Sequence, residues 1–264
     1  MGVALNLVFA SLWLAVATVA VWLLAATEVG VQLGLRLHRA HDEPRIRQIG
    51  AIQGAILGLL ALLLGFTFAM AAERYDTRRG LVLDEANALG TTYLRAGLLP
   101  DAQGTVVRDL LPRYLTARLE FYDAGEDEVR LAAAEQDAAR LQAELWALAE
   151  RAGRAAPSPI VAAFVVSLNE SIDLAAARGH AARTRVPQAV WLLLLVVAAG
   201  GCFSTGYAAG ASGVRAWVSS LALPLLLAVV MTLIADLDRP RGGLIRISQQ
   251  PMLDLKAGWS APGR

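Results

Sequence analysis

A charged run that directly follows a long apolar segment holds the side chains best suited to chemistry. Its functional groups belong to Glu73, Arg74, Tyr75, Asp76 and Arg79, with Glu85 and Asn87 further along. On a helix Arg74 and Arg78 share one face, whereas Asp76 and Arg79 are three residues apart and can pair. The same residues also fit an ordinary interfacial anchor of arginines and a tyrosine.

A second polar cluster follows the last apolar segment of the chain. It contains Asp236, Asp238, Arg239, Pro240 and Gly242. Proline and glycine end helices, and charged residues resume here, so the cluster predicts an abrupt helix stop at the membrane boundary. Two carboxylates fall short of the about six to eight oxygen ligands that calcium takes, so we expect no calcium site.

No other group of residues predicts a catalytic or metal centre. His38, His41, Asp42 and Glu43 lie close in sequence but lack the further well-spaced soft ligands of a zinc site. The single cysteine, Cys202, lies in an apolar segment and is interpreted as a small core residue. The sequence carries no nucleophile elbow, zinc-protease, P-loop or dinucleotide motif. We therefore expect a protein that is not an enzyme and that uses no cofactor or metal.

Hydropathy identifies the elements that must position these residues. Of the 264 residues 56% are hydrophobic and 18% charged, which is too apolar for an ordinary water-soluble domain. The charges leave four long gaps, at 2–27, 48–72, 186–214 and 216–235. About 20 apolar residues cross a hydrocarbon core, so each gap predicts a membrane-spanning helix. With 24 basic and 23 acidic residues the chain has no net positive field for nucleic acid, and none is expected as a partner.

The polar part of the chain predicts a helical domain between the second and third spans. Residues 73–185 carry 17 acidic and 14 basic side chains, a net charge of −3, and show helical periodicity throughout. We therefore expect an all-α integral membrane protein. Its domains would be two spanning helices and a loop in 1–72, a cytoplasmic helical bundle in 73–185, two further spans in 186–235 joined by a glycine-rich turn at 206–213, and a tail in 236–264.

Arginines near the membrane predict which side this domain occupies. Nine lie on the side of the central domain and the termini: Arg74, Arg78, Arg79, Arg178, Arg183, Arg185, Arg239, Arg241 and Arg246. Five lie on the other side: Arg36, Arg39, Arg45, Arg47 and Arg215. Cytoplasmic loops carry the excess of basic residues, so the central domain and both termini are predicted to be cytoplasmic. The chain is rich in alanine, and Lys256 is its only lysine, a composition typical of a GC-rich bacterium, so the membrane is expected to be a bacterial inner membrane.

The second span has a stripe of small residues and a separate apolar face. The stripe consists of Gly50, Gly54, Gly58 and Gly65. Small residues allow close helix packing in lipid, so the stripe predicts a helix contact. The other face would present Leu59, Leu62, Phe66 and Met70. That face could line a narrow hydrophobic pore or simply touch lipid.

The run 62–87 resembles the pore-helix segment of bacterial bestrophins. That pattern is an apolar run with a phenylalanine, then an acidic residue, an arginine, an aromatic residue, a further arginine and a later asparagine. The matching residues are Glu73, Arg74, Tyr75, Arg79 and Asn87. Together with the segments 73–100, 183–191 and 236–255, this run identifies the chain as a member of the bestrophin-like family of bacterial membrane proteins.

The resemblance implies a passive chloride channel in the lipid bilayer. It implies a homo-pentamer with five copies of the second span around an axis, an apolar neck that gates by dewetting, and Arg74 and Arg79 attracting inorganic anions at the cytoplasmic mouth. The alternative is a non-conducting membrane scaffold or sensor whose large helical domain binds a partner protein or a lipid. The four spans contain no ionisable residue, which disfavours a proton-coupled transporter.

Overall fold

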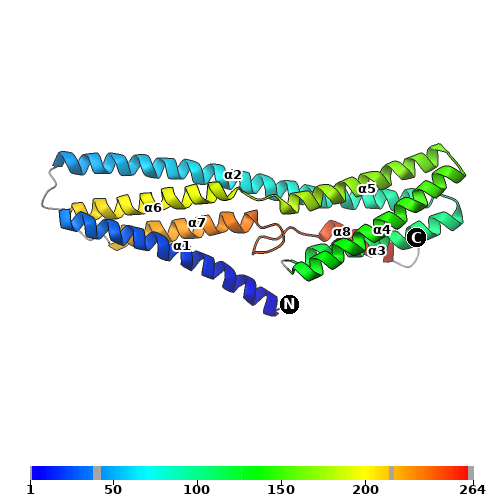
Figure 1. The fold of residues 1–264 in the computed structure, drawn as a ribbon, viewed down its shortest axis with the longest axis horizontal. Helices are drawn as coiled ribbons and strands as arrows, with labels where there is room; N and C mark the ends of the chain where they lie inside the picture. The colour runs from blue at the N-terminus through cyan, green and yellow to red at the C-terminus, as the bar shows by residue number, and fades with distance from the viewer. Residues whose placement is uncertain (1, 38–42, 126, 214–216, 261–264) are drawn as a thin grey trace. The chain divides into compact units, whose positions relative to one another are not determined.

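The described part of the chain is built from helices alone. The computed structural model describes residues 2–37, 43–125, 127–213 and 217–260, and within them it contains eight helices and no strand. The helices are α1 (Gly2–Leu37), α2 (Glu43–Ala96), α3 (Asp101–Asp123), α4 (Glu128–Ala155), α5 (Pro159–Arg183), α6 (Gln188–Ala211), α7 (Trp217–Asp238) and α8 (Gln250–Ser260) (Figure 1). The predicted all-α fold is confirmed.

Four stretches of the described helices are long and apolar enough to cross a membrane. They are Trp13–Leu37 in α1, Pro44–Ala96 in α2, Pro159–Ala211, which includes α6, and Ser220–Asp238 in α7. Each of these stretches contains most of one charge-free gap of the sequence, as far as the structure describes it. The predicted number of spanning helices is confirmed on length and composition.

Several helix ends differ from the prediction. Helix α1 continues past Thr27 to Leu37, and on its exposed surface Gln32 Nε2 donates to Glu28 Oε1 one turn earlier, at 3.1 Å. The predicted glycine-rich turn at 206–213 is wrong over most of its length, since α6 extends to Ala211. Helix α8 in the tail was not predicted at all.

The chain divides into two compact units. The first comprises Met1–Glu73, Arg185–Arg239 and Gly243–Ile245. The second comprises Arg74–Thr184, Pro240–Gly242 and Arg246–Arg264. Each unit has its own core: Leu23, Leu60, Leu194, Cys202 and Met231 belong to that of the first.

Glycines on α1 and α6 form a close helix contact in the first unit. Gly30 and Gly34 lie on α1, and Gly206 and Gly210 lie on α6, four residues apart in each helix. A Cβ atom added to any of them would collide with main-chain atoms of the facing helix; at Gly206 the obstacle is the carbonyl oxygen of Thr27. In lipid, where tight packing replaces the hydrophobic effect, such glycines let two backbones approach directly.

The predicted glycine stripe of the second span does not pack within the chain. Gly50, Gly54, Gly58 and Gly65 are exposed, and a Cβ atom at each would meet no described atom within 4 Å. The close packing expected of small residues therefore occurs at α1 and α6 instead. A role for the α2 stripe in contacts between chains stays a prediction.

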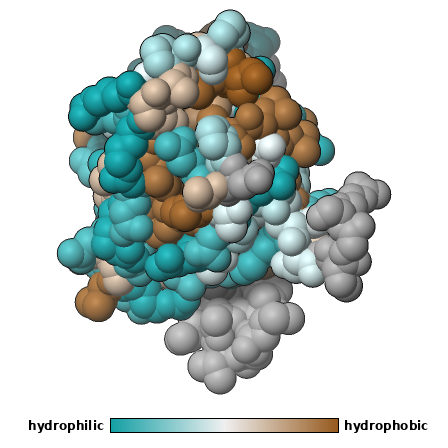
Figure 2. All heavy atoms as spheres, turned by 90° about the vertical axis from the view of Figure 1, so that its right-hand side faces the viewer, coloured by the Kyte–Doolittle hydropathy of each residue, from teal (hydrophilic) through white to brown (hydrophobic). Residues whose placement is uncertain are grey.

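The second unit is a helical bundle with a core of leucine, alanine and aromatic residues. Side-chain caps begin two of its helices: Asp127 accepts hydrogen bonds from the main chain at the start of α4, and Ser158 does so at the start of α5. The tail helix α8 completes the core through Met252, which is fully buried, and through Trp259, which stacks on Tyr93 with ring centroids 4.5 Å apart. Figure 2 shows hydrophilic residues spread over the viewed face, interrupted by apolar patches.

Candidate functional site

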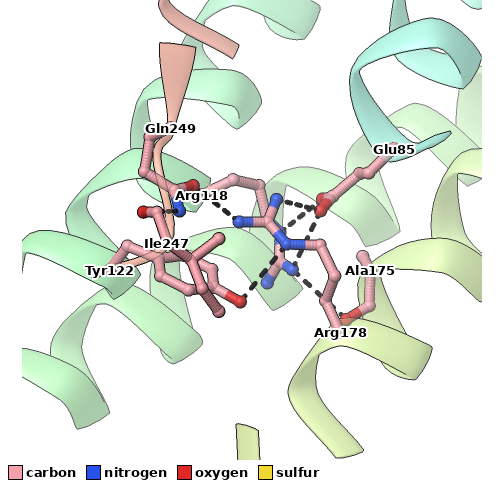
Figure 3. Close-up of polar contacts among 7 residues, drawn as sticks. All are labelled: Glu85, Arg118, Tyr122, Ala175, Arg178, Ile247 and Gln249. Carbon is pink, nitrogen blue, oxygen red and sulfur yellow. Dashed lines mark hydrogen bonds and ion pairs between the residues drawn. The ribbon is translucent and has the colours of Figure 1, made fainter. Parts of the chain in front are cut away.

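Three charged side chains meet in the interior of the second unit. Glu85 of α2, Arg118 of α3 and Arg178 of α5 have exposed fractions of 0%, 7% and 1% (Figure 3). Arg118 Nε donates to Glu85 Oε1 at 2.7 Å and its Nη2 contacts Oε2 at 3.4 Å. Arg178 Nη1 donates to the same Oε2 atom. One carboxylate therefore accepts hydrogen bonds from two guanidinium groups; we call these three residues the buried cluster.

Further partners fix the two arginines in place. Arg118 Nη2 donates to the carbonyl oxygen of Ala175 at 3.2 Å. Arg178 Nε donates to the Tyr122 hydroxyl at 3.3 Å, and its guanidinium carbon lies 4.2 Å from the centroid of that ring. Arg178 Nη2 donates to Gln249 Oε1 at 2.8 Å, so the segment before α8 also reaches the cluster (Figure 3). Three helices and the tail are thus joined through one set of hydrogen bonds.

The buried cluster holds more positive than negative charge. Glu85 contributes −1 and the two arginines +2, a sum of +1. Burial alone would lower the pKa of Arg118, but the charge of Glu85 and its hydrogen bond outweigh that effect and raise the pKa, so Arg118 stays charged. Burial raises the pKa of the neighbouring Tyr114 phenol to about 12, so Tyr114 is neutral at physiological pH.

Helical periodicity explains how these charges come to be buried. The inner face of α5 is formed by Phe164, Leu168, Ser171, Ala175, Arg178 and Ala182. Arg178 thus occupies a core position of an otherwise small or apolar stripe, three residues after Ala175. Arg118 likewise follows Tyr114 and Leu115 on the buried face of α3. An arginine at a core position of a helical stripe is the sequence signal that could have identified this cluster.

Of the predicted interfacial residues, only Glu85 enters the buried cluster. Glu73, Asp76, Arg79 and Asn87 are exposed, whereas Arg74 and Tyr75 are half-buried. Arg74 Nη1 is buried without a hydrogen-bond partner among the described residues. The motif therefore contains one residue of a structural core and several that face outward from the chain.

Two arginines used to predict sidedness are in fact interior residues. Arg78 is buried, and it donates to the carbonyl oxygens of Ala181 at 3.2 Å and Thr184 at 3.1 Å. These acceptors lie at the end of α5, where carbonyl groups lack helical partners. Arg178 belongs to the buried cluster. Neither can act as an interfacial charge. The number of arginines that support a cytoplasmic central domain therefore falls from nine to seven, against five on the opposite side.

The tail motif is a hydrogen-bonded loop. Helix α7 ends at Asp238, and Pro240, Arg239 and Gly242 follow it in the described loop. The Asp236 carboxylate accepts from the main-chain N–H groups of Leu244 and Ile245, each at 2.9 Å to Oδ2. Asp238 Oδ2 accepts from the N–H of Val186 at 3.0 Å.

A glycine makes the return of this loop towards Asp236 possible. Gly243 has a φ of +95°, a conformation that other residues rarely adopt, and a Cβ atom there would collide with the Asp236 carboxylate. The two aspartates therefore bind main-chain groups of the protein itself.

We expect the Asp236→Ala variant to be destabilised by about 1–3 kcal/mol, because two main-chain donors lose a charged acceptor. The measurement is thermal unfolding in detergent followed by tryptophan fluorescence. Asp254→Ala is the matched control, since Asp254 is exposed and accepts a hydrogen bond from the Gln250 side chain one turn earlier. Equal melting temperatures for the two variants would show that the loop does not depend on Asp236.

The residues predicted to form a pore neck lie mostly on the surface of the single chain. Leu59, Leu62 and Phe66 have exposed fractions of 50%, 54% and 63%, and Met70 is half-buried. The side of α2 turned to its own chain carries Leu60 and other buried residues instead. The first three neck residues thus form an apolar face that no described part of the chain covers.

The histidine group lies largely outside the described residues. This applies to His38, His41 and Asp42, while Glu43 is the first residue of α2. Within the described ranges, no group of three or more histidine, cysteine, aspartate or glutamate side chains could hold a metal ion.

Comparisons with known proteins connect this architecture to one family. The family model of the bestrophin-like domain matches residues 10–252. Three variants of a bacterial bestrophin homolog from Klebsiella pneumoniae have similar structures. The first variant has a TM-score of 0.67 at 14% identity, and the match covers 92% of this chain and 98% of that one. The second variant has a TM-score of 0.61 at 15% identity and covers 89% and 99%. The third variant has a TM-score of 0.60 at 14% identity and covers 90% and 98%. A search of the curated proteins gave no match.

Proposed function

This chain belongs to the bestrophin-like family, and from that premise we propose that it forms a passive anion channel, with chloride as the ion conducted. The proposal places it in the bacterial inner membrane as a homo-pentamer, with the second unit and both termini in the cytoplasm. The supporting observation is the uncovered surface of α2. Two faces of this spanning helix are left uncovered by the described part of their own chain. In an oligomer, other copies of the protein could cover one of these two faces.

Helical geometry separates the three faces of α2. At 3.6 residues per turn, the glycine stripe, the Leu59, Leu62 and Phe66 face, and the buried side around Leu60 are each about a third of a turn apart. The buried side packs on the chain itself. In the proposed pentamer the glycine stripe lies against the neighbouring subunit, and the leucine and phenylalanine face lines the central passage.

The chemistry of the proposed pore follows from these side chains. A narrow ring of leucine and phenylalanine excludes water, so ions cross only when the ring widens. The exposed guanidinium of Arg79 lies beyond the apolar ring, on the same side of α2 as the glycine stripe, and its positive charge at the cytoplasmic end attracts anions rather than cations. The spans contain no ionisable residue that would couple transport to protons, which supports passive flow.

Chloride efflux from liposomes containing the purified protein tests this proposal. We expect the Phe66→Ala variant to leak chloride several times faster than the parent, because truncation widens the apolar ring. Leu226→Ala is the matched control: Leu226 is as exposed as Phe66, at 64%, but it lies on α7 and is not part of the proposed neck. The two variants should have the same subunit number by mass measurement in detergent.

Identical leak rates for the two variants would contradict the assignment of the neck. An absence of flux from correctly assembled pentamers would overturn the channel and favour a membrane scaffold or sensor that acts through its helical domain. A reporter that is active only in the cytoplasm, fused after Arg264, tests the proposed sidedness separately.

A further inference from the structure

A cleft lies beside the buried cluster, within the second unit, where α3, α4 and α5 meet. Its volume is about 380 Å³. Polar side chains line one part of it: Arg118, Glu135, Gln142, His180 and Arg183. Small residues form much of the remaining wall: Ala138, Ala139, Ala175, Ala176 and Gly179. The small side chains leave the space open between the helices, so the cleft arises directly from the alanine-rich sequence of α4 and α5.

Arg118 connects this cleft to the buried cluster. Its Nε and Nη2 atoms donate to Glu85 and Ala175, whereas its Nη1 atom has no hydrogen-bond partner among the described residues. Arg118 is more than nine-tenths buried and also lines the cleft. Its Nη1 atom is not one of the fully buried polar atoms without a partner, so the cleft gives access to it. A guanidinium nitrogen with unused donors in a confined space is a good partner for an anion.

The local charge matches a ligand with a single negative charge. The buried cluster sums to +1, from one carboxylate and two guanidinium groups. At the rim Arg183 Nη2 pairs with Glu135 Oε1 at 2.9 Å, and that pair adds no net charge. A monoanion would neutralise these groups, and the Arg241 guanidinium, 4.8 Å from the centroid of the Phe121 ring that also lines the cleft, adds further positive charge nearby.

The cleft continues into an apolar groove between α4 and α5. A second cavity of about 370 Å³ shares Ala139, Gln142 and Ile172 with the first and extends to Trp146 and Asn169. Together the two cavities fall within the usual size range of small-molecule sites, about 300–1,000 Å³. The site has a cationic end at Arg118 and an aromatic, aliphatic end at Trp146 and Ile172.

We propose that this groove binds a small amphiphilic monocarboxylate. The carboxylate accepts a hydrogen bond from Arg118 Nη1 in the cleft that His180 also lines, and Gln142 lies where the two cavities meet. The aliphatic or aromatic part of the ligand lies along Ala139 and Ile172 towards Trp146. The site is separate from the proposed passage along α2 and does not depend on whether the protein conducts ions.

Calorimetric titration of the full-length protein in nanodiscs with 4-phenylbutyrate, and separately with octanoate, tests the site. Both acids carry one carboxylate on an apolar body, and the tighter one identifies an aromatic or an aliphatic ligand. We expect saturable binding of at least one acid, and at least tenfold weaker binding of the matching uncharged amide. Trp146 fluorescence should change on binding of the acid.

Two glutamate variants of α4 separate the site from general effects of added charge. Ala139→Glu places a carboxylate in the groove without altering the buried cluster and should weaken binding of the acid at least tenfold. Ala133→Glu adds the same charge at an exposed position of α4 that does not line the groove, and should leave binding unchanged. No saturable binding of either acid, equal binding of acid and amide, or unchanged binding by Ala139→Glu would overturn the proposal. None of these outcomes bears on chloride flux.

Discussion

Replacing Glu85 with glutamine should lower the melting temperature of the protein by roughly 6–20 °C. The change removes the carboxylate that pairs with both Arg118 and Arg178 and leaves two guanidinium groups facing each other in the core of the second unit. Breaking a buried ion pair by removing one partner destabilises a protein by about 3–5 kcal/mol. For a chain of this size each kcal/mol corresponds to about 2–4 °C. The measurement is thermal unfolding followed by tryptophan fluorescence.

A matched surface variant shows whether burial causes the effect. Glu144 pairs with Arg140 at 2.8 Å on the half-exposed face of α4, and an exposed pair contributes only about 0–1 kcal/mol. Glu144→Gln should therefore shift the melting temperature by a few degrees at most. Adding Arg178→Met to Glu85→Gln removes one uncompensated charge and should recover part of the lost stability. Similar melting temperatures for Glu85→Gln and Glu144→Gln would contradict the structural role of the buried cluster.

Alanine at Gly206 should destabilise the first unit by about 3 kcal/mol, the upper end of the usual range for overpacking. The added methyl group meets the carbonyl oxygen of Thr27, and a main-chain atom cannot rotate away as a side chain can. Helices α1 and α6 must therefore move apart along the whole contact. Thermal unfolding in detergent, followed by a label on the first unit, measures the loss.

Gly200 provides a control on the same helix. A Cβ atom there meets no described atom within 4 Å, so Gly200→Ala gains helix propensity without any collision. We expect it to be stabilising by up to about 1 kcal/mol. The same chemical change is thus expected to lower the free energy of unfolding at Gly206 and to raise it at Gly200. If Gly200→Ala destabilised the protein as much as Gly206→Ala, the close contact at Gly206 would be refuted.

Hydropathy predicted the number of spanning helices because charge is strongly disfavoured in the bilayer core. It failed at the helix ends, where charge is tolerated: Glu28 marked the expected end of the first span, but α1 continues to Leu37. The glycines of α6 were interpreted as a turn from their low helix propensity. In lipid a close helix contact outweighs that propensity, and only the facing residues on α1 reveal it.

The buried cluster was the part of the site hardest to predict. Glu85 was selected as part of the charged run that follows the second span, while Arg178 was counted among the arginines near the membrane. Both assignments were made from where the residue lies along the chain, without knowledge of its partners in space. Arg178, on α5, is buried because α2, α3 and the segment around Gln249 surround it, and contacts between residues so far apart in sequence leave no local pattern. Helical spacing with Ala175 was the one available local signal.

The contact between α1 and α6 sets an order of events during biosynthesis. Gly34 and Gly206 are separated by more than half of the chain, and translation at about 5–20 residues per second needs roughly 10–30 s to cover that distance. During that interval α1 is already in the bilayer with its glycine face open to lipid or to another helix. Ribosome stalling or truncation before α6 would therefore leave an inserted helix hairpin with an unsatisfied contact surface, a substrate for membrane quality control.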